Sequence, residues 1–391
     1  MKNLLFILFI ISSSLYSMSL DELIEKSLSQ NPSLEVINHR ISSVKQESSV
    51  ADSFANPTLT YTQNTIDDDQ AMSQKTVTFV QKLPYFGKRD SMKDVSVAQE
   101  GVLAETLEQA KVNIVNEIKN QAYIAWEYEE LYNIINEYEE LTKQNIELFE
   151  SYTSTSDNQH MGIMSAELTL SDLKIQKSTL TAKIKTAYAK LSYLSNSQVD
   201  SLHVELKMDD LEEDLSLSNR LSNNHYLSIK DEEIKKNEAI AKNAELSNYP
   251  DVNLIAGYSR RENFDNYYTF GLGLTLPIYG TEDAKEQSAR ALVLATKSEK
   301  QDTLIALESD FKTAYLQMKS ANEIYHIIND EALPQLDHMF ELTSSSIATG
   351  GDLFKYIDIL VQKLKLEQKS ITSIANYNRA EAKIAALNGE I

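Results

Sequence analysis

The chain has 391 residues, with 37 Lys and Arg against 58 Asp and Glu, a formal charge of −21 and an isoelectric point near 4.8. This acidity argues against nucleic acid as a partner, because phosphates require surfaces rich in Lys and Arg. The chain contains no cysteine. That absence excludes disulfides, thiolate metal sites, a cysteine nucleophile and a lipid anchor on an N-terminal cysteine.

The N-terminus has the features of a secretory signal peptide. One lysine, Lys2, precedes an almost wholly apolar run from Leu4 to Ile11, and small polar residues follow it. The run is too short to span a bilayer as a helix, which needs ~20 residues. We therefore assign residues 1–19 to a signal peptide, with cleavage after Ser17 or Ser19, and expect the mature protein to be exported.

The remainder of the chain repeats itself at a distance of 193 residues. The sequence Leu83-Pro84-Tyr85-Phe86-Gly87 recurs as Leu276-Pro277-Ile278-Tyr279-Gly280. At the same distance Pro57 recurs as Pro250, and Asn31 and Leu34 recur as Asn224 and Leu227. Three landmarks with one spacing predict a tandem duplication, with one structural repeat at 20–205 and a second at 206–391.

Each repeat contains two segments in which apolar and polar residues alternate. They cover 57–64 and 75–83 in the first repeat and 251–259 and 267–277 in the second, and they predict β-hairpins at about 57–83 and 250–277. In the clearest segment, five apolar residues share one side and Thr and Gly occupy the other. The apolar set is Tyr268, Phe270, Leu272, Leu274 and Leu276. The pattern is typical of a transmembrane β-barrel strand, although a half-buried soluble sheet produces the same alternation.

The hairpins are followed by long stretches with few helix breakers. They predict one long helical hairpin at about 87–195 and another at about 281–388, far longer than the average helix of ~11–12 residues. Apolar residues on two sides of the first helix predict neighbours on both sides, as in a ring of helices. Clusters of Ser, Thr, Asn and Gly at 153–162 and 343–352 predict the turns. Between strand and helix, Pro84, Gly87, Pro277 and Gly280 are expected to act as hinges.

Four strands are too few for a transmembrane barrel. Unpaired backbone groups are not tolerated in hydrocarbon, and the smallest bacterial barrels have eight strands. The chain must then share a barrel with copies of itself. Two copies give eight strands and a filled interior, so a conducting pore favours at least three copies.

The order of these features resembles the TolC-like outer-membrane efflux family. The resemblance rests on the signal peptide, Asn31-Pro32-Ser33-Leu34, the strand pair after Asn56-Pro57, and Gln81-Lys82-Leu83-Pro84-Tyr85-Phe86-Gly87-Lys88-Arg89, followed by a long helical hairpin and then a repeat. It implies a mainly α fold with a β-barrel part. Long helical hairpins would form a periplasmic α-barrel, and four transmembrane strands per chain would be completed as a 12-stranded barrel in a homotrimer.

The resemblance also implies a location, partners and a cargo. It places the protein in the outer membrane of a Gram-negative bacterium, with a large periplasmic part that docks to a periplasmic adaptor and an inner-membrane pump. The Gly87-Lys88-Arg89 ending is most similar to the branch that exports heavy-metal cations. A conduit for type I protein secretion is an alternative with the same architecture, and a periplasmic coiled-coil structural or adaptor protein is a further alternative. The sequence does not identify the cargo or the particular pump and adaptor.

Two sets of site residues follow from the resemblance. The family has an aspartate ring at its periplasmic gate, and Asp358 matches the first acid of that motif, while Val361 replaces the second. The alternative is that Asp358 is an ordinary solvated helix residue. We expect the hairpin tips at 153–163 and 346–353, with Gly162, Gly350, Gly351 and Asp352, to dock the adaptor. The alternative is that these glycines only permit a turn.

The sequence contains no recognisable catalytic, cofactor or metal site. None of its six histidines forms a pair three or four residues apart, the spacing that a helical metal site requires. Met161 and Met164 could contact a soft metal, but methionine more often serves packing. We therefore expect no enzyme activity, cofactor or bound metal.

Overall fold

The computed structural model describes residues 18–64, 70, 72–151, 157–208, 221–347 and 353–391. The chain divides into two compact units. The helical unit comprises the described residues of Met1–Pro32, Val112–Ser216 and Asp310–Ile391, and the sheet unit those of Ser33–Lys111 and Leu217–Ser309. Two helices, α3 (Lys88–Ser151) and α7 (Thr281–His326), contribute residues to both units.

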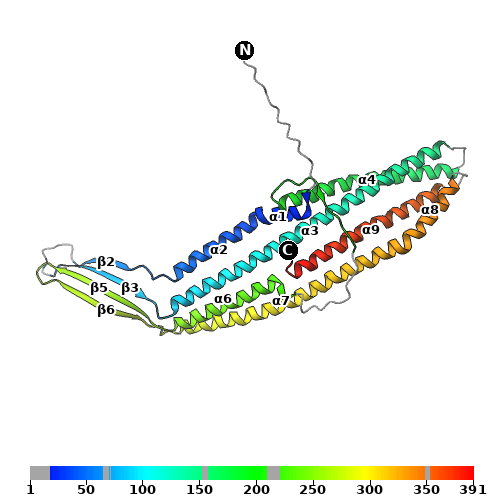
Figure 1. Ribbon diagram of the computed structural model, residues 1–391. Helices are drawn as coiled ribbons and strands as arrows, with labels where there is room; N and C mark the ends of the chain where they lie inside the picture. The colour runs from blue at the N-terminus through cyan, green and yellow to red at the C-terminus, as the bar shows by residue number, and fades with distance from the viewer. Residues whose placement is uncertain (1–17, 65–69, 71, 152–156, 209–220, 348–352) are drawn as a thin grey trace, which may run out of the picture. The chain divides into compact units, whose positions relative to one another are not determined.

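The sheet unit contains four antiparallel strands. They are β2 (Thr58–Gln63), β3 (Gln74–Leu83), β5 (Asp251–Arg261) and β6 (Tyr267–Thr275), and their order is β2-β3-β5-β6. The hairpin of the first repeat thus joins the hairpin of the second through β3 and β5, and the four strands lie side by side in Figure 1. All four alternating segments of the sequence form strands, and β2 and β6 are the edges of this sheet.

Helices continue the sheet unit beyond the strands. The first parts of α3 and α7 are accompanied by α2 (Pro32–Ala51) and α6 (His225–Ser247). Asn224 caps α6, because its side chain accepts hydrogen bonds from the backbone N–H groups of Tyr226 and Leu227. Pro32 opens α2, the position where a helix tolerates proline best. These two residues explain why the helices start where they do.

The repeat found in the sequence is also a repeat of structural elements. Four elements of the second half start 193 residues after their counterparts: α2 and α6 start at Pro32 and His225, β2 and β5 at Thr58 and Asp251, β3 and β6 at Gln74 and Tyr267, and α3 and α7 at Lys88 and Thr281. The two strand-to-helix junctions therefore occupy equivalent places in the two halves.

Both junctions contain a glycine in a left-handed backbone conformation. Gly87 has φ +84° and Gly280 has φ +73°, and each immediately precedes its long helix. The strand β6 ends at Thr275, two residues before the predicted end at 277. The chain turns there, because Pro277 has no N–H for the ladder and the N–H of Ile278 donates to the carbonyl of Leu276 at 3.1 Å. Leu276 consequently lies just outside the strand.

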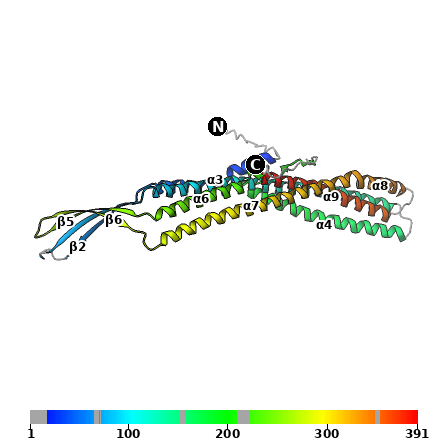
Figure 2. The same cartoon turned by 90° about the horizontal axis from the view of Figure 1, so that it is seen from below.

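The helical unit packs long helices around a shared core. It contains α1 (Leu20–Gln30), α4 (Asp157–Leu194), α8 (Leu333–Ile347), α9 (Leu353–Leu387) and the remaining parts of α3 and α7. In both ribbon views α9 lies between α4 and α8 (Figure 2). One core cluster joins α3, α4 and α9 through residues such as Ile135, Leu173 and Leu360. None of the described helices has a long enough apolar stretch to cross a bilayer.

A second core cluster lies around the N-terminal strand and the first helix, α1, of the helical unit. The strand β1 (Met18–Ser19) pairs in parallel with β4 (Leu202–His203). Ser19 then caps α1 in a reciprocal box, in which its Oγ accepts from the N–H of Glu22 and its own N–H donates to the Glu22 carboxylate. Cleavage after Ser17, one of the two expected positions, would retain this strand and cap, whereas cleavage after Ser19 would remove both.

The helix of the second half is interrupted where that of the first half is continuous. A π-helical turn, Ile327–Ala332, separates α7 from α8 and is followed by Pro334. Proline cannot donate the usual helical hydrogen bond and crowds the preceding turn, and a π-bulge accommodates such a residue. The equivalent position in the first half, 193 residues earlier, is Leu141, and α3 runs through it. The helix expected from 281 is thus divided at the π-helical turn Ile327–Ala332, just before Pro334.

Candidate functional site

The strand register gathers apolar side chains on one face of the sheet, which we call the apolar face. Phe79, Ala256 and Phe270 lie opposite one another on three adjacent strands. The next rows are Val77, Tyr258 and Tyr268 on one side and Gln81, Leu254 and Leu272 on the other. Because side chains two residues apart share a face, β2 adds Leu59 and Tyr61 to the same surface.

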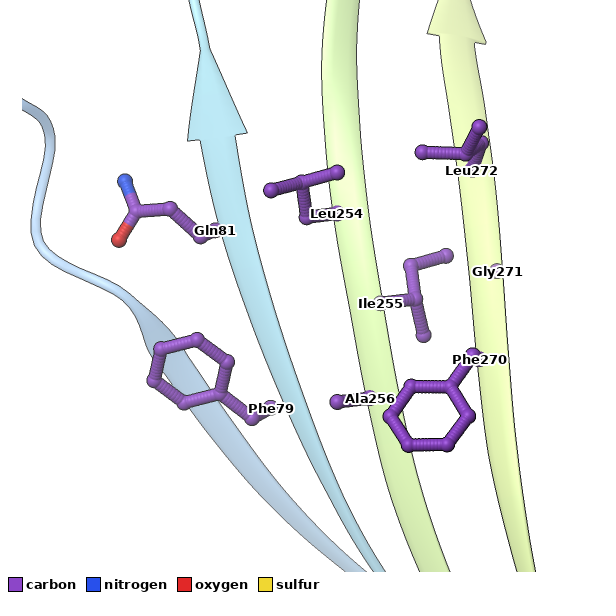
Figure 3. Close-up of a pocket in the computed structure, with 8 residues that line it drawn as sticks. All are labelled: Phe79, Gln81, Leu254, Ile255, Ala256, Phe270, Gly271 and Leu272. Atoms are coloured by element: carbon purple, nitrogen blue, oxygen red, sulfur yellow. The ribbon is translucent and has the colours of Figure 1, made fainter.

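The apolar face is exposed in the single chain. Of the residues expected to face lipid, Phe270 is 82% exposed, Leu272 75% and Tyr268 72%, and Leu274 and Leu276 are also exposed. Figure 3 shows part of this surface, with Phe79 and Gln81 on β3, Leu254 and Ala256 on β5, and Phe270 and Leu272 on β6. A continuous exposed apolar surface of this kind marks an interaction site, with membrane or protein.

The opposite face of the sheet, the polar face, consists mainly of hydroxyl groups and glycine. One row contains Thr60, Thr78, Gly257 and Thr269, and the next contains Thr62, Thr76, Ser259 and Tyr267. The second row is joined by hydrogen bonds, since the Gln74 amide donates to Thr76, Ser259 and Tyr267 at 2.9–3.2 Å. Glycines at 257, 271 and 273 all lie on this face, where missing side chains favour inward curvature of a barrel.

The sheet has two edges in the single chain. Strands β2 and β6 each pair with one neighbour among the described residues, which leaves their outer backbone groups available to another strand. An exposed apolar sheet with open edges would be a strong aggregation hazard for a soluble monomer. The surface and the edges therefore need further partners.

An ion pair fixes the junction between β3 and α3. The Lys88 ammonium donates to Asp251 at 2.7 Å and to the carbonyl of Tyr249 at 2.8 Å. Asp251 also accepts from the N–H of Tyr85 at 2.9 Å. Pro84 and Gly87 lie within this tied segment, and Pro277 and Gly280 lie in the equivalent segment of the second half. The positions that correspond to Lys88 and Asp251 at the 193-residue spacing are Thr281 and Thr58, which carry no charge.

The gate candidate Asp358 is an exposed residue of α9. Its neighbours Ile357 and Ile359 are buried, and its carboxylate accepts a hydrogen bond from Gln362 at 2.7 Å. The side chain thus lies on the free face of the helix. The other gate position of the motif, Val361, is half-buried.

The hairpin tips are only partly described. Gly350, Gly351 and Asp352 lie outside the described residues. Gly162 was expected to offer its backbone to a partner, but it is buried, and a Cβ there would lie 2.9 Å from the Cβ of Leu353. Gly162 therefore allows α4 and α9 to approach each other closely. The exposed neighbours are Met161 and Met164, which are 63% and 56% exposed.

Several ionisable groups are buried between helices of the helical unit. The Glu139 carboxylate accepts from Lys177 at 2.8 Å and lies 2.9 Å from the Lys143 ammonium, and these partners lower its pKa to about 2. Arg379 donates to Glu127 at 2.7 Å. The Lys177–Glu139 pair joins α4 to α3, and the Arg379–Glu127 pair joins α9 to α3. Within the described part of the chain no three His, Asp or Glu side chains are grouped as a metal site. The sequence pattern did not indicate these pairs, because they depend on which helices become neighbours.

Comparisons with known proteins identify the architecture. No protein-family model matches the chain, and no curated protein sequence matches it. Among solved structures, the channel-forming protein CusC has a TM-score of 0.81 at 13% identity over 95% of this chain and 92% of its own. The Neisseria gonorrhoeae MtrE outer-membrane channel has 0.81 at 15% identity over 95% and 89%, and the Vibrio cholerae outer-membrane protein VceC has 0.78 at 14% identity over 95% and 96%. The chain has the TolC-like fold of these channels: long α-helical hairpins with a β part that is incomplete in one chain.

Proposed function

We propose that this protein is the outer-membrane channel of a tripartite efflux system, a passive exit duct for solutes. One observation carries the proposal: the sheet has an exposed apolar face, a hydroxyl-lined polar face and two open edges. This is the arrangement that a segment of a transmembrane barrel needs, with lipid outside and water inside. The similarity to solved outer-membrane channels supports the same function.

Three copies are proposed to complete the barrel. The outer edge of β2 in one copy would pair with β6 of the next, so that no backbone group in the bilayer is unpaired. Three four-stranded sheets make a twelve-stranded barrel, wide enough to leave an aqueous pore, whereas eight strands would be filled by side chains. The homotrimer is thus the smallest ring of copies that conducts.

The periplasmic part is proposed to provide the gate and the adaptor contact. Three copies of Asp358 around the axis would form a carboxylate ring that concentrates cations. The Asp358→Asn variant should then conduct with lower cation selectivity, measured as a smaller reversal potential under a salt gradient. An unchanged reversal potential would remove Asp358 from the gate.

Docking of the adaptor is proposed for the two hairpin tips: the one with Gly350, Gly351 and Asp352, which lie outside the described residues, and the one with the exposed Met161 and Met164. Loops on a rigid scaffold are common binding surfaces. Charge reversal at Asp352 should abolish both adaptor pull-down and export while the trimer remains intact. Full export with the adaptor still bound would place docking elsewhere.

Fractionation tests the location, and susceptibility tests the cargo. The protein should sediment with the outer membrane and require detergent for release, whereas release by salt or alkali would contradict the proposal.

A deletion strain challenged with metal cations and with small toxic compounds should show which class it no longer exports. If neither class becomes more toxic, but a secreted protein accumulates inside the cell, the conduit serves protein secretion.

A further inference from the structure

The apolar face of the sheet carries two charged residues at one of its ends. Among the residues of the four strands β2, β3, β5 and β6 whose side chains share this face, only Lys75 and Arg260 are charged, and the register places them directly opposite each other on β3 and β5. We call them the cationic pair. Residues opposite each other in antiparallel strands have Cβ atoms about 4.5–5.5 Å apart, so one anion can contact both side chains.

Arg260 is accessible to a ligand. It is exposed, and its side chain forms no ion pair or hydrogen bond with any residue that the structure describes. The next residue, Arg261, lies on the polar face, where its guanidinium donates to the carbonyl of Asp265 at 2.9 Å. Like charges directly opposite each other destabilise a sheet, and an anion shared by the cationic pair would offset that repulsion.

The cationic pair lies at the end of the sheet away from the helices. The strand β3 leads into α3 from Leu83, and β5 follows α6 at Asp251, whereas Lys75 and Arg260 lie near the opposite ends of these strands, next to the hairpin turns. Because the helical part is proposed to be periplasmic, this end of the proposed barrel reaches the outer leaflet of the membrane.

A row of tyrosines lies next to the cationic pair. Tyr61, Tyr258 and Tyr268 share the adjacent register row of the apolar face, and the rings of Tyr258 and Tyr268 are 5.2 Å apart. Tyrosine is enriched at membrane–water interfaces. The eight residue steps from Tyr268 to Leu276 cover roughly 21 Å of height at a rise of ~3.4 Å and a tilt of ~40°, close to the apolar band of about 25 Å in outer-membrane barrels. In the proposed barrel the tyrosines therefore mark the outer interface, and the cationic pair lies one row further out, among the lipid headgroups.

An open apolar hollow lies on the same face, further from the turns. Phe79, Ala256 and Phe270 form one row of its lining, with two leucines in the next row (Figure 3). The small side chain of Ala256 separates the two aromatic rings. Ala256 is four residues from Arg260 along β5, roughly 14 Å of strand. An acyl chain can thus occupy the hollow while its headgroup reaches the cationic pair.

We propose that Arg260 and Lys75 bind a phosphate group of an anionic lipid in the outer leaflet, with an acyl chain of that lipid in the hollow. Phosphate oxygens accept charge-assisted hydrogen bonds, and a planar guanidinium donates two of them in parallel. The tyrosines and the hollow favour a lipid over a free anion, because they provide apolar surface for its chains. The inference rests on the proposed outer-membrane barrel and adds the lipid that its outer rim recognises.

The test uses the detergent-extracted protein after its native lipid has been removed. Lipid A, a glycolipid with two phosphate groups, is added in steps, and native mass spectrometry counts the molecules bound; dephosphorylated lipid A is the matched probe. We expect the phosphorylated lipid to bind more tightly to the parent protein. Arg260→Gln and Lys75→Gln should each weaken its binding roughly two- to fivefold, as expected for an exposed ion pair, and should leave binding of the dephosphorylated lipid unchanged.

Arg261→Gln is the control variant. It removes the same charge one residue away, on the polar face, and should bind lipid A like the parent. Equal weakening by Arg260→Gln and Arg261→Gln would indicate general charge attraction and overturn the site. Equal affinity of the parent for the two lipids would overturn the headgroup contact, and displacement of lipid A by inorganic phosphate at the same concentration would overturn the choice of a lipid.

Location and conductance of the same protein separate this inference from the proposed function. A trimer that conducts and lies in the outer membrane, yet gives any of these contrary binding results, would overturn the lipid site and leave the channel standing. A protein that is absent from the outer membrane would overturn both.

Discussion

The Lys88 ammonium lies 2.7 Å from the Asp251 carboxylate and ties the start of α3 to the start of β5. The pair connects the two repeats at the place where strands give way to helices. The Lys88 and Asp251 side chains are only 12% and 14% exposed, so screening by water weakens the attraction between their charges little. The positions that correspond to Lys88 and Asp251 at the 193-residue spacing, Thr281 and Thr58, carry no charge, and the two junctions are therefore held differently.

Removing this charge should loosen the junction. Asp251→Asn keeps an oxygen for the Tyr85 N–H but leaves the Lys88 ammonium without its carboxylate, and charged hydrogen bonds contribute about 1.5–3 kcal/mol. We expect a lower midpoint of heat unfolding in detergent, followed by circular dichroism. Asp302→Asn, at an exposed position in the middle of α7, is the control and should unfold like the parent. Equal midpoints for both variants would show that the pair does not stabilise the junction.

The two hinge glycines should resist substitution for conformational reasons. Alanine at Gly87 or Gly280 must adopt φ +84° or +73°, which costs an L-residue about 1–2 kcal/mol. At Gly280 no described atom lies within 4 Å of the position that a Cβ would occupy, so crowding is not the cause there. Gly271→Ala is the matched control, because its Cβ would make an ordinary contact at 3.6 Å with Ile255. If Gly280→Ala is as stable as Gly271→Ala in urea titration, the hinge argument fails.

Gly162 should behave as a packing residue. Gly162→Val would force the added side chain into Leu353, and overpacking of this kind typically costs about 1–3 kcal/mol. Leu353→Ala in the same chain should recover part of the loss by making room. The unfolding midpoints of the single and double variants measure this coupling. A Gly162→Val protein with parental stability that nonetheless loses the adaptor would instead support the docking role expected from the sequence.

The Glu139 cluster predicts acid sensitivity of the helical unit. The pKa of the Glu139 carboxyl is lowered from 4.5 to about 2 by Lys143 and Lys177. Its contribution to stability is therefore fully present above about pH 4.5 and is lost as the pH falls towards about 2. Glu139→Gln should cost about 1–3 kcal/mol at pH 7 and progressively less below pH 4.5. Glu137→Gln, at an exposed position of α3, should show no such pH dependence. A constant difference between Glu139→Gln and the parent from pH 7 to pH 3 would contradict the assignment.

A charged residue on the apolar face should destabilise the protein in the membrane. Leu272→Arg, if near the bilayer midplane, should cost about 2–4 kcal/mol of membrane insertion. Thr269→Arg lies on the polar face of the same strand and should insert normally. The amount of each variant in purified outer membranes measures the difference. Equal insertion of the two variants would mean that the apolar face is covered by protein rather than lipid.

Much of the architecture could be predicted from the sequence because it is encoded locally. The alternation in 267–277 and the 193-residue spacing indicated the strands and the repeat, and the predicted fold class is confirmed. The join between β3 and β5 was not predictable, because alternation defines a strand's faces but not its neighbour. The π-helical turn before Pro334 and the packing of Gly162 on Leu353 also depend on contacts between elements. Asp358 could be located by its motif. Its proposed role in the gate was not predictable, because that role depends on how several copies of the chain are arranged.

The stoichiometry and conductance of the purified protein test the proposed channel most directly. The detergent-extracted complex is weighed by native mass spectrometry and then inserted into a planar lipid bilayer. We expect a mass of three copies and discrete ion-conducting steps from that species. A monomer that conducts, or a trimer that never conducts, would contradict the proposal.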